Sequence, residues 1–135
     1  MKISESKIVE WFLRLAISAG FLSAVADRLG YYPKAISVWG NWENFIAYTK
    51  TLNPYFSDGL IPVLGYTATI LEIIFGILLL IPYKTTWVAK GSGFLVLLFA
   101  FAMITSIGFK APLDYSVFCV AGAAFALSIL TKESK

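Results

Sequence analysis

Apolar residues along this chain gather into four long runs separated by polar segments. The runs cover about residues 8–29, 62–81, 88–109 and 112–130. Each is close to twenty residues long, which is the length of α-helix that crosses the hydrocarbon core of a bilayer. The pattern predicts an all-α protein, an antiparallel four-helix bundle in a membrane, formed by a single domain over residues 1–135.

Turn-forming residues mark the ends of these runs. Gly30 follows the first run, Pro62 opens the second and Pro82 ends it, in positions that glycine and proline favour at helix ends. Only Lys110 and Ala111 separate the third run from the fourth. So short a connection predicts a tight antiparallel hairpin between the last two helices.

The first loop, residues 30–61, is rich in aromatic and amide side chains. Part of it has helical spacing, at Val38, Trp39, Trp42, Phe45, Ile46 and Thr49. This spacing predicts an amphipathic helix between the first and second membrane helices. Two placements are open: a helix lying at the outer interface, anchored by its tryptophans and tyrosines, or a lid over a pocket between the helices.

Composition agrees with a bilayer as the solvent. Charged residues make up 14% of the chain and hydrophobic residues 59%, with a mean hydropathy of +0.77, whereas soluble domains carry roughly 25% charged residues. The eleven Lys and Arg residues are scattered between the apolar runs. The net charge of +3 therefore reflects membrane topology and does not indicate a nucleic-acid partner.

The distribution of basic residues predicts the orientation in the membrane. One side of the bundle would carry six lysines near the helix ends: Lys2, Lys7, Lys84, Lys90, Lys132 and Lys135. The other would carry four basic residues: Arg28, Lys34, Lys50 and Lys110. The positive-inside rule then places both termini in the cytoplasm, and we expect a multi-pass protein of the inner (plasma) membrane. The first run lacks a cleavage site after a short apolar core, so we expect it to be a retained helix.

The residue types exclude several kinds of chemistry. The chain has no histidine and one cysteine, Cys119, which argues against most metal sites, histidine-held haem and an internal disulfide. No nucleophile and base pair or phosphate-binding loop is found. We therefore expect no catalytic residue, no metal and no intrinsic cofactor, and we expect Cys119 to be a small buried side chain.

Two charged residues fall deep within the predicted membrane helices. Arg14 lies about 9 Å into the first helix, and Glu72 lies about 13 Å from the cytoplasmic end of the second, at 1.5 Å per residue. Antiparallel neighbours would place the two residues at similar levels. Because buried charges in a membrane need partners, we expect an Arg14–Glu72 ion pair, with Glu10 as a second acceptor. Structural and functional roles for this pair are equally open. Stripes of small residues support close helix contact: Ala16, Gly20 and Ala24, and Ala68, Glu72 and Gly76.

A second polar cluster is expected at the opposite end of the bundle. Its members close the first helix or flank the last turn: Asp27, Arg28, Lys110, Asp114 and Tyr115. In one interpretation, Asp114 only stabilises the N-terminus of the fourth helix. In the other, the cluster forms an outer mouth that binds a small polar ligand or a quinone head group.

The sequence resembles the DoxX family of small bacterial membrane proteins over nearly its whole length. The resemblance is carried by Leu13-Arg14-Leu15-Ala16 with Gly20 and Phe21, and by Glu72-Ile73-Ile74-Phe75-Gly76-Ile77-Leu78-Leu79-Leu80-Ile81. It implies four membrane helices and an association with oxidoreductases, since relatives include subunits of a thiosulfate and quinone oxidoreductase and membrane partners in oxidative-stress complexes. Near the end of the first helix, where the family often has Gly-x-x-Lys, this chain has Ala24-Val25-Ala26-Asp27-Arg28. This segment keeps a basic residue but adds an acidic one.

Three functions are consistent with these features. The first is a non-catalytic, redox-associated membrane subunit that binds a quinone or a redox partner protein. The second is a module that binds or transports a small solute through a cavity beside Arg14 and Glu72. The third is a structural scaffold that forms homo-oligomers in the lipid bilayer through its small-residue stripes.

Overall fold

The chain is all-α in the computed structural model, which describes residues 2–133. Six helices occur in this range: α1 (Glu5–Arg28), α2 (Trp42–Leu52), α3 (Ile61–Leu79), α4 (Thr85–Ile107), α5 (Lys110–Asp114) and α6 (Val117–Glu133). The described residues form no strand. The all-α class expected from the sequence is confirmed. Lys135, one of the lysines in the predicted topology, lies outside the described residues.

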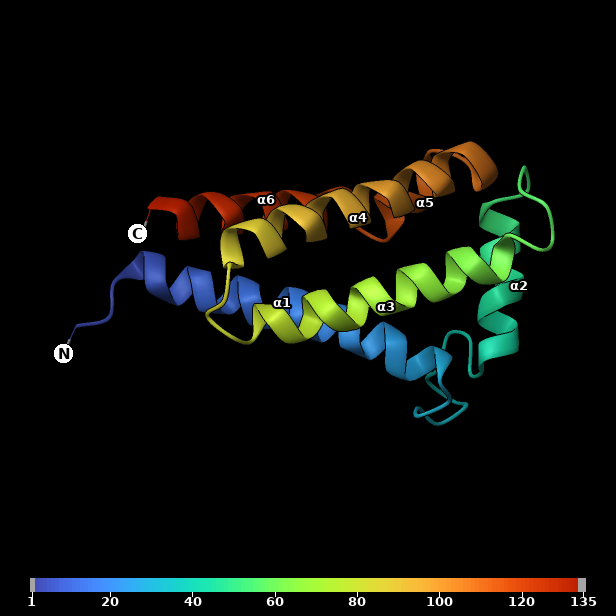
Figure 1. Ribbon diagram of the computed structural model, residues 1–135, viewed down its shortest axis with the longest axis horizontal. Coiled ribbons are helices and arrows are strands. Elements are labelled where there is room, and N and C mark those ends of the chain that lie inside the picture. The colour runs from blue at the N-terminus through green and yellow to red at the C-terminus, as the bar shows by residue number, and fades with distance from the viewer. Residues whose placement is uncertain (1, 134–135) are drawn as a thin grey trace.

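The four longer helices lie side by side (Figure 1). Each of α1, α3, α4 and α6 contacts two of the others, in a ring in which α1 meets α3 and α6, and α4 meets α3 and α6. The two ends of the chain lie at one end of the molecule, together with the turn between α3 and α4. We call this the terminal end. The opposite end, where α2 crosses the ends of the other helices, is the loop end.

Three of the helices, α1, α3 and α4, are long and apolar enough to cross a membrane. The apolar helix α6 is shorter, at 17 residues. Many large apolar side chains on these helices face outward, among them Phe12, Ile70, Phe94, Leu98 and Phe101, each more than half exposed. An exposed apolar surface of this extent is expected of a protein that is solvated by lipid.

Small residues let neighbouring helices approach closely. A Cβ atom built on Gly93 of α4 would lie 2.7 Å from Cζ of Phe125 on α6, and one on Gly76 of α3 would lie 2.9 Å from Leu22 on α1. The Ala68–Glu72–Gly76 stripe therefore does face a neighbouring helix, as expected. The α1 stripe does not, because Ala16 and Gly20 are exposed and a Cβ on Gly20 would meet nothing within 4 Å.

The expected two-residue hairpin between the last helices is wrong. Helix α4 ends at Ile107, the short helix α5 holds Lys110 to Asp114, and α6 begins only at Val117. Two residues with positive φ break the helical path, Gly108 at 104° and Ser116 at 56°. Pro112 therefore lies in the five-residue α5 and does not open the last long helix.

The amphipathic helix expected in the first loop is present as α2. Asn41 caps it, accepting a hydrogen bond from the backbone N–H of Asn44 at 2.8 Å, and Gly40, with a φ of 83°, turns the chain just before it. Val38 and Trp39 therefore lie outside the helix, although their spacing suggested that they belonged to it. This places Trp39 on the loop that approaches α1.

Candidate functional site

A cavity of about 590 Å³ lies at the loop end, enclosed by α1, α3 and α4 and covered by α2. Most of its wall is apolar, with Phe45, Leu52, Leu71, Leu95, Phe99 and Met103 among the lining residues. Its volume falls in the range of about 300–1,000 Å³ in which pockets hold drug-sized ligands. The few polar side chains of its wall are therefore the ones that would orient a ligand.

An ion pair between α1 and α3 forms part of this wall. Arg28 Nη1 lies 2.5 Å from Glu72 Oε2, and it also donates to Thr69 Oγ1 at 2.9 Å. Both charged side chains are buried, with 4% of each exposed. Because the pair is enclosed and neutral as a unit, it adds polarity to the cavity without adding net charge.

The expected partner of Glu72 was wrong: it is Arg28, not Arg14. Arg14 lies level with Leu79, to whose carbonyl its Nε donates at 2.8 Å. Glu72 is seven residues before Leu79, or about 10 Å along α3 at 1.5 Å per residue. Side chains on a helix lean toward its N-terminus, so Arg28 at the end of α1 reaches back toward the middle of the bundle and meets Glu72.

Two buried hydrogen-bond donors at the cavity have no acceptor among the described residues: Arg28 Nε and Trp39 Nε1. Both residues line the cavity. The guanidinium of Arg28 stacks over two aromatic rings, with its carbon 3.9 Å from the centroid of Phe45 and 5.2 Å from that of Trp39. An unpaired buried donor costs about 1–3 kcal/mol, so these two groups favour a ligand that accepts hydrogen bonds.

Asp27 holds the loop that carries Trp39. Its carboxylate accepts hydrogen bonds from the backbone N–H groups of Val38, Trp39 and Gly40, at 2.7, 2.9 and 3.1 Å. The consecutive residues Asp27 and Arg28 thus fix both of the unpaired donors, one through the loop and one directly. Sequence reasoning missed Trp39 as a site residue. The signal that could have found it is an acidic residue at a helix end whose carboxylate lacks a partner nearby in the chain.

Helix α2 covers the cavity in the way that the lid interpretation predicts. Phe45, Tyr48 and Thr49 on one face of α2 line the cavity. The same helix packs tightly on α3, because a Cβ on Gly65 would lie 2.6 Å from Cδ1 of Ile46. Burial, together with the nearby phenol of Tyr115, raises the pKa of Tyr48 above its usual value. The phenol of Tyr48 therefore stays neutral at the cavity wall.

The polar outer mouth expected at this end does not form as one cluster. Asp27 and Arg28 are buried and engaged as described, whereas Lys110 and Asp114 pair with each other on exposed α5, at 2.7 Å. Asp114 ends α5 and is not in the first turn of a long helix, so its expected role at a helix N-terminus is also wrong. Of the α5 region, Tyr115 does line the cavity.

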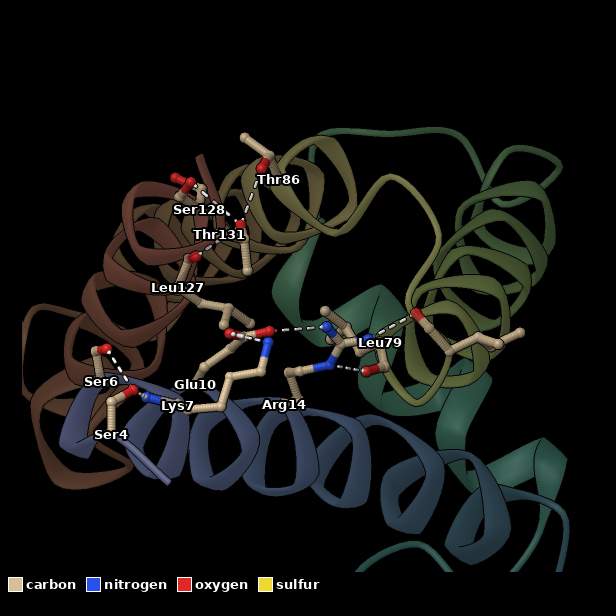
Figure 2. Close-up of polar contacts among 11 residues, drawn as sticks. Ser4, Ser6, Lys7, Glu10, Arg14, Leu79, Thr86, Leu127, Ser128 and Thr131 are labelled. Carbon is tan, nitrogen blue, oxygen red and sulfur yellow. Dashed lines mark hydrogen bonds and ion pairs between the residues drawn. The ribbon is translucent and has the colours of Figure 1, made fainter. Parts of the chain in front are cut away.

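Arg14 belongs to a second polar network, at the terminal end (Figure 2). Its Nη1 lies 3.2 Å from Glu10 Oε1, which confirms Glu10 as an acceptor, and its Nη2 donates to the carbonyl of Ile81 at 2.6 Å. With the bond to Leu79, the guanidinium satisfies carbonyls at the end of α3, where helices leave them unpaired. Figure 2 shows Lys7, Glu10 and Arg14 pointing from α1 into the space between the helices.

A smaller cavity of about 190 Å³ adjoins this network, with Lys7, Lys84 and Thr85 in its wall. Here Arg14 already has three acceptors. The network is therefore complete within the chain, and its geometry explains the packing of α1 against the end of α3. At the loop-end cavity, by contrast, Arg28 Nε and Trp39 Nε1 have no acceptor in the part of the chain that the structure describes.

The described residues offer few side chains that could bind a metal ion or carry out redox chemistry. Within residues 2–133, no three His, Cys, Asp or Glu side chains are grouped so that they could hold a metal ion. Cys119 is exposed on α6, where a buried side chain was expected. No family model, curated protein or solved structure matches the chain.

Proposed function

We propose that this protein is a DoxX-like, non-catalytic membrane subunit that binds a quinone in the loop-end cavity and serves a redox partner. One observation carries the proposal: Arg28 Nε and Trp39 Nε1 are buried at a mostly apolar cavity, and neither atom has a hydrogen-bond acceptor among residues 2–133. A quinone offers carbonyl oxygens to such donors and an apolar ring and chain to the rest of the wall.

Charge balance favours a neutral head group over an anion. Glu72 already neutralises Arg28, so an anionic ligand would bring an uncompensated charge into an enclosed site, which is costly at low dielectric. A neutral carbonyl makes the hydrogen bonds without that penalty. The rings of Phe45 and Trp39, which stack with Arg28, can also contact a flat head group.

The membrane arrangement belongs to the same proposal. Helices α1, α3, α4 and α6 each cross the bilayer, and the 17 residues of α6 reach the lower end of the range of about 17–25 that spans it. The loop end faces outward and both termini are cytoplasmic in the inner membrane, following the basic residues near the terminal end. The cavity then opens within the outer half of the bilayer.

The first test is to identify what the purified protein retains. Lipophilic molecules are extracted from protein isolated in mild detergent and quantified by mass spectrometry, beside an unrelated four-helix membrane protein. A quinone close to one per chain, absent from the control, is the expected result. Bulk phospholipid alone, together with no binding of an added short-chain quinone, would reject the quinone and leave the solute-binding and scaffold functions.

The second test assigns the site to the two donors. Trp39→Phe removes the indole N–H while keeping an aromatic ring, and it is expected to weaken quinone binding several-fold, in line with about 0.5–1.5 kcal/mol for one hydrogen bond. Trp42→Phe is the matched control, because Trp42 lies on α2 and does not line the cavity. Equal affinities for the two variants would place the head group elsewhere.

A further inference from the structure

Helices α3 and α4 are in close contact at one level of the bundle. A Cβ on Gly91 of α4 would lie 2.9 Å from Cζ of Phe75 on α3. No residue between these two positions and the turn that joins the helices lines the loop-end cavity, whose wall ends at Glu72 on α3 and at Leu95 on α4. The Phe75–Gly91 contact therefore closes the space between the two helices on the side of the terminal end.

Nearer the loop end, the same two helices have residues that both line the cavity and are exposed. Thr67 on α3 and Leu98 on α4 are such residues, with Leu98 65% exposed. Thr67 lies eight residues from Phe75 on α3, and Leu98 lies seven residues from Gly91 on α4. Because α3 and α4 are antiparallel and Phe75 meets Gly91, Thr67 and Leu98 lie at about the same level. The cavity therefore reaches the molecular surface between α3 and α4.

The surface around this opening is apolar. Ile70 on α3 is 53% exposed, and Phe94 and Phe101 on α4 are 62% and 67% exposed. Thr67 is six residues, or about 9 Å at 1.5 Å per residue, from the start of α3. In a bilayer of about 30 Å of hydrocarbon, an opening at that depth meets lipid chains and not water.

We infer that the ligand reaches the cavity sideways from the bilayer, through the opening between Thr67 and Leu98, and that its chain stays in this opening while its head group lies at Arg28 and Trp39. The inference rests on the proposed function and narrows its ligand class. The ligand is a lipid with a neutral, hydrogen-bond-accepting head group and a long apolar chain. Because the chain leaves the cavity, its length is not limited by the volume of about 590 Å³.

The test closes the opening reversibly. In a Cys119→Ser background, Thr67→Cys and Leu98→Cys are joined by a short crosslinker that contains a reducible disulfide. Exchange of a long-chain quinone in lipid nanodiscs is followed by quenching of tryptophan fluorescence. Linked protein is expected to take up and release quinone about tenfold or more slowly, as when a gate is shut. Reduction of the crosslinker should restore the original rate in the same sample.

The outcomes separate the two proposals. If the unlinked parent binds no quinone, the proposed function fails and the lateral route fails with it. If the parent binds quinone but linked and reduced protein exchange it at the same rate, the lateral route is overturned while the proposed function stands. The control is the Cys119→Ser protein without added cysteines, treated with the same reagent, which should exchange quinone at the untreated rate.

Chain length gives an independent readout that needs no variant. Quinones with the same head group and successively longer chains are compared at equal concentrations in the bilayer. With the chain passing through the opening, affinity is expected to level off as chains lengthen. A sharp loss of binding beyond the length that the cavity can enclose would show a closed pocket and overturn the inference.

Discussion

Arg28 and Glu72 form an ion pair between α1 and α3, 44 residues apart in the sequence, with Nη1 and Oε2 separated by 2.5 Å and both side chains almost completely buried. The pair lies at the wall of the loop-end cavity. Each of its members therefore has two roles, in the contact between the helices and in the polarity of the cavity.

Breaking this pair should destabilise the protein strongly. Glu72→Gln or Arg28→Met alone is expected to lower the free energy of unfolding by about 3–5 kcal/mol, because one buried charge is left unpaired. The double variant should recover much of that loss, as measured by thermal unfolding in detergent. Arg14→Met combined with Glu72→Gln is the matched control and should be additive. If the effects of Arg14→Met and Glu72→Gln were non-additive while those of Arg28→Met and Glu72→Gln were additive, Arg28 would not be the partner of Glu72.

Arg14 is expected to require its forked guanidinium. Arg14→Lys keeps the charge, but one ammonium group cannot match the geometry of Leu79, Ile81 and Glu10 together. The loss in unfolding free energy should be about 1–3 kcal/mol, the penalty of a buried unpaired acceptor. Lys7→Met, on the half-exposed side of the same network, should change stability by about 1 kcal/mol or less. A Lys variant as stable as the parent would show that the forked geometry is unimportant.

The contact between α4 and α6 should be sensitive to a single methyl group. Gly93→Ala places a Cβ against the ring edge of Phe125, with three ring atoms between 2.7 and 2.9 Å, and overpacking of this kind costs about 1–3 kcal/mol. Gly20→Ala, on the open face of α1, meets nothing within 4 Å and should leave stability unchanged or raise it by about 0.5–1 kcal/mol. Melting temperatures of the two variants provide the comparison, and the reverse order would mean that α4 and α6 are not closely packed.

Tyr48 should make the stability of the folded protein depend on pH in the alkaline range. Burial raises its pKa above the usual 10.0, so the folded state holds the phenol proton more tightly than the unfolded state does. Its contribution to stability is complete below the unfolded pKa and is lost as the pH rises through the folded pKa. The melting temperature of the parent should therefore fall more steeply above pH 10 than that of Tyr48→Phe. Parallel curves would show that the phenol is not enclosed.

Sequence patterns predicted the elements better than their contacts. The apolar runs predicted α1, α3 and α4 to within a few residues, because length and hydrophobicity alone define such helices. The start of α6 was missed because Ser116 adopts a positive φ, which is rare for a residue other than glycine and which no turn rule indicates. Proline is common at the first position of a helix, so Pro112 suggested the start of the last long helix, but the break at Ser116 leaves it in α5.

The ion pairs depended on information that spacing does not contain. Depth along each helix suggested that Arg14 and Glu72 were level, but the register of α1 against α3 is set by contacts such as Ser18 Oγ donating to the carbonyl of Gly76 at 2.6 Å. The direction of a long side chain matters as well, since Arg28 lies at the end of α1 and reaches inward. Glu10, one turn from Arg14 on the same helix, was predictable because it needed no knowledge of packing.

Asp27 fixes the part of the α1–α2 loop that carries Trp39, whereas the tip of this loop lies apart from that contact. A Cβ on Gly30 would lie 3.3 Å from the carbonyl oxygen of Gly40, so the chain leaves and returns at nearly the same point. Lys34 and Ala35, at the exposed tip, do not line the cavity. Exposed tips of this kind tolerate added sequence. A fluorescent tag or an epitope inserted between these two residues would therefore report on the protein in living cells while leaving the indole of Trp39 at the cavity wall.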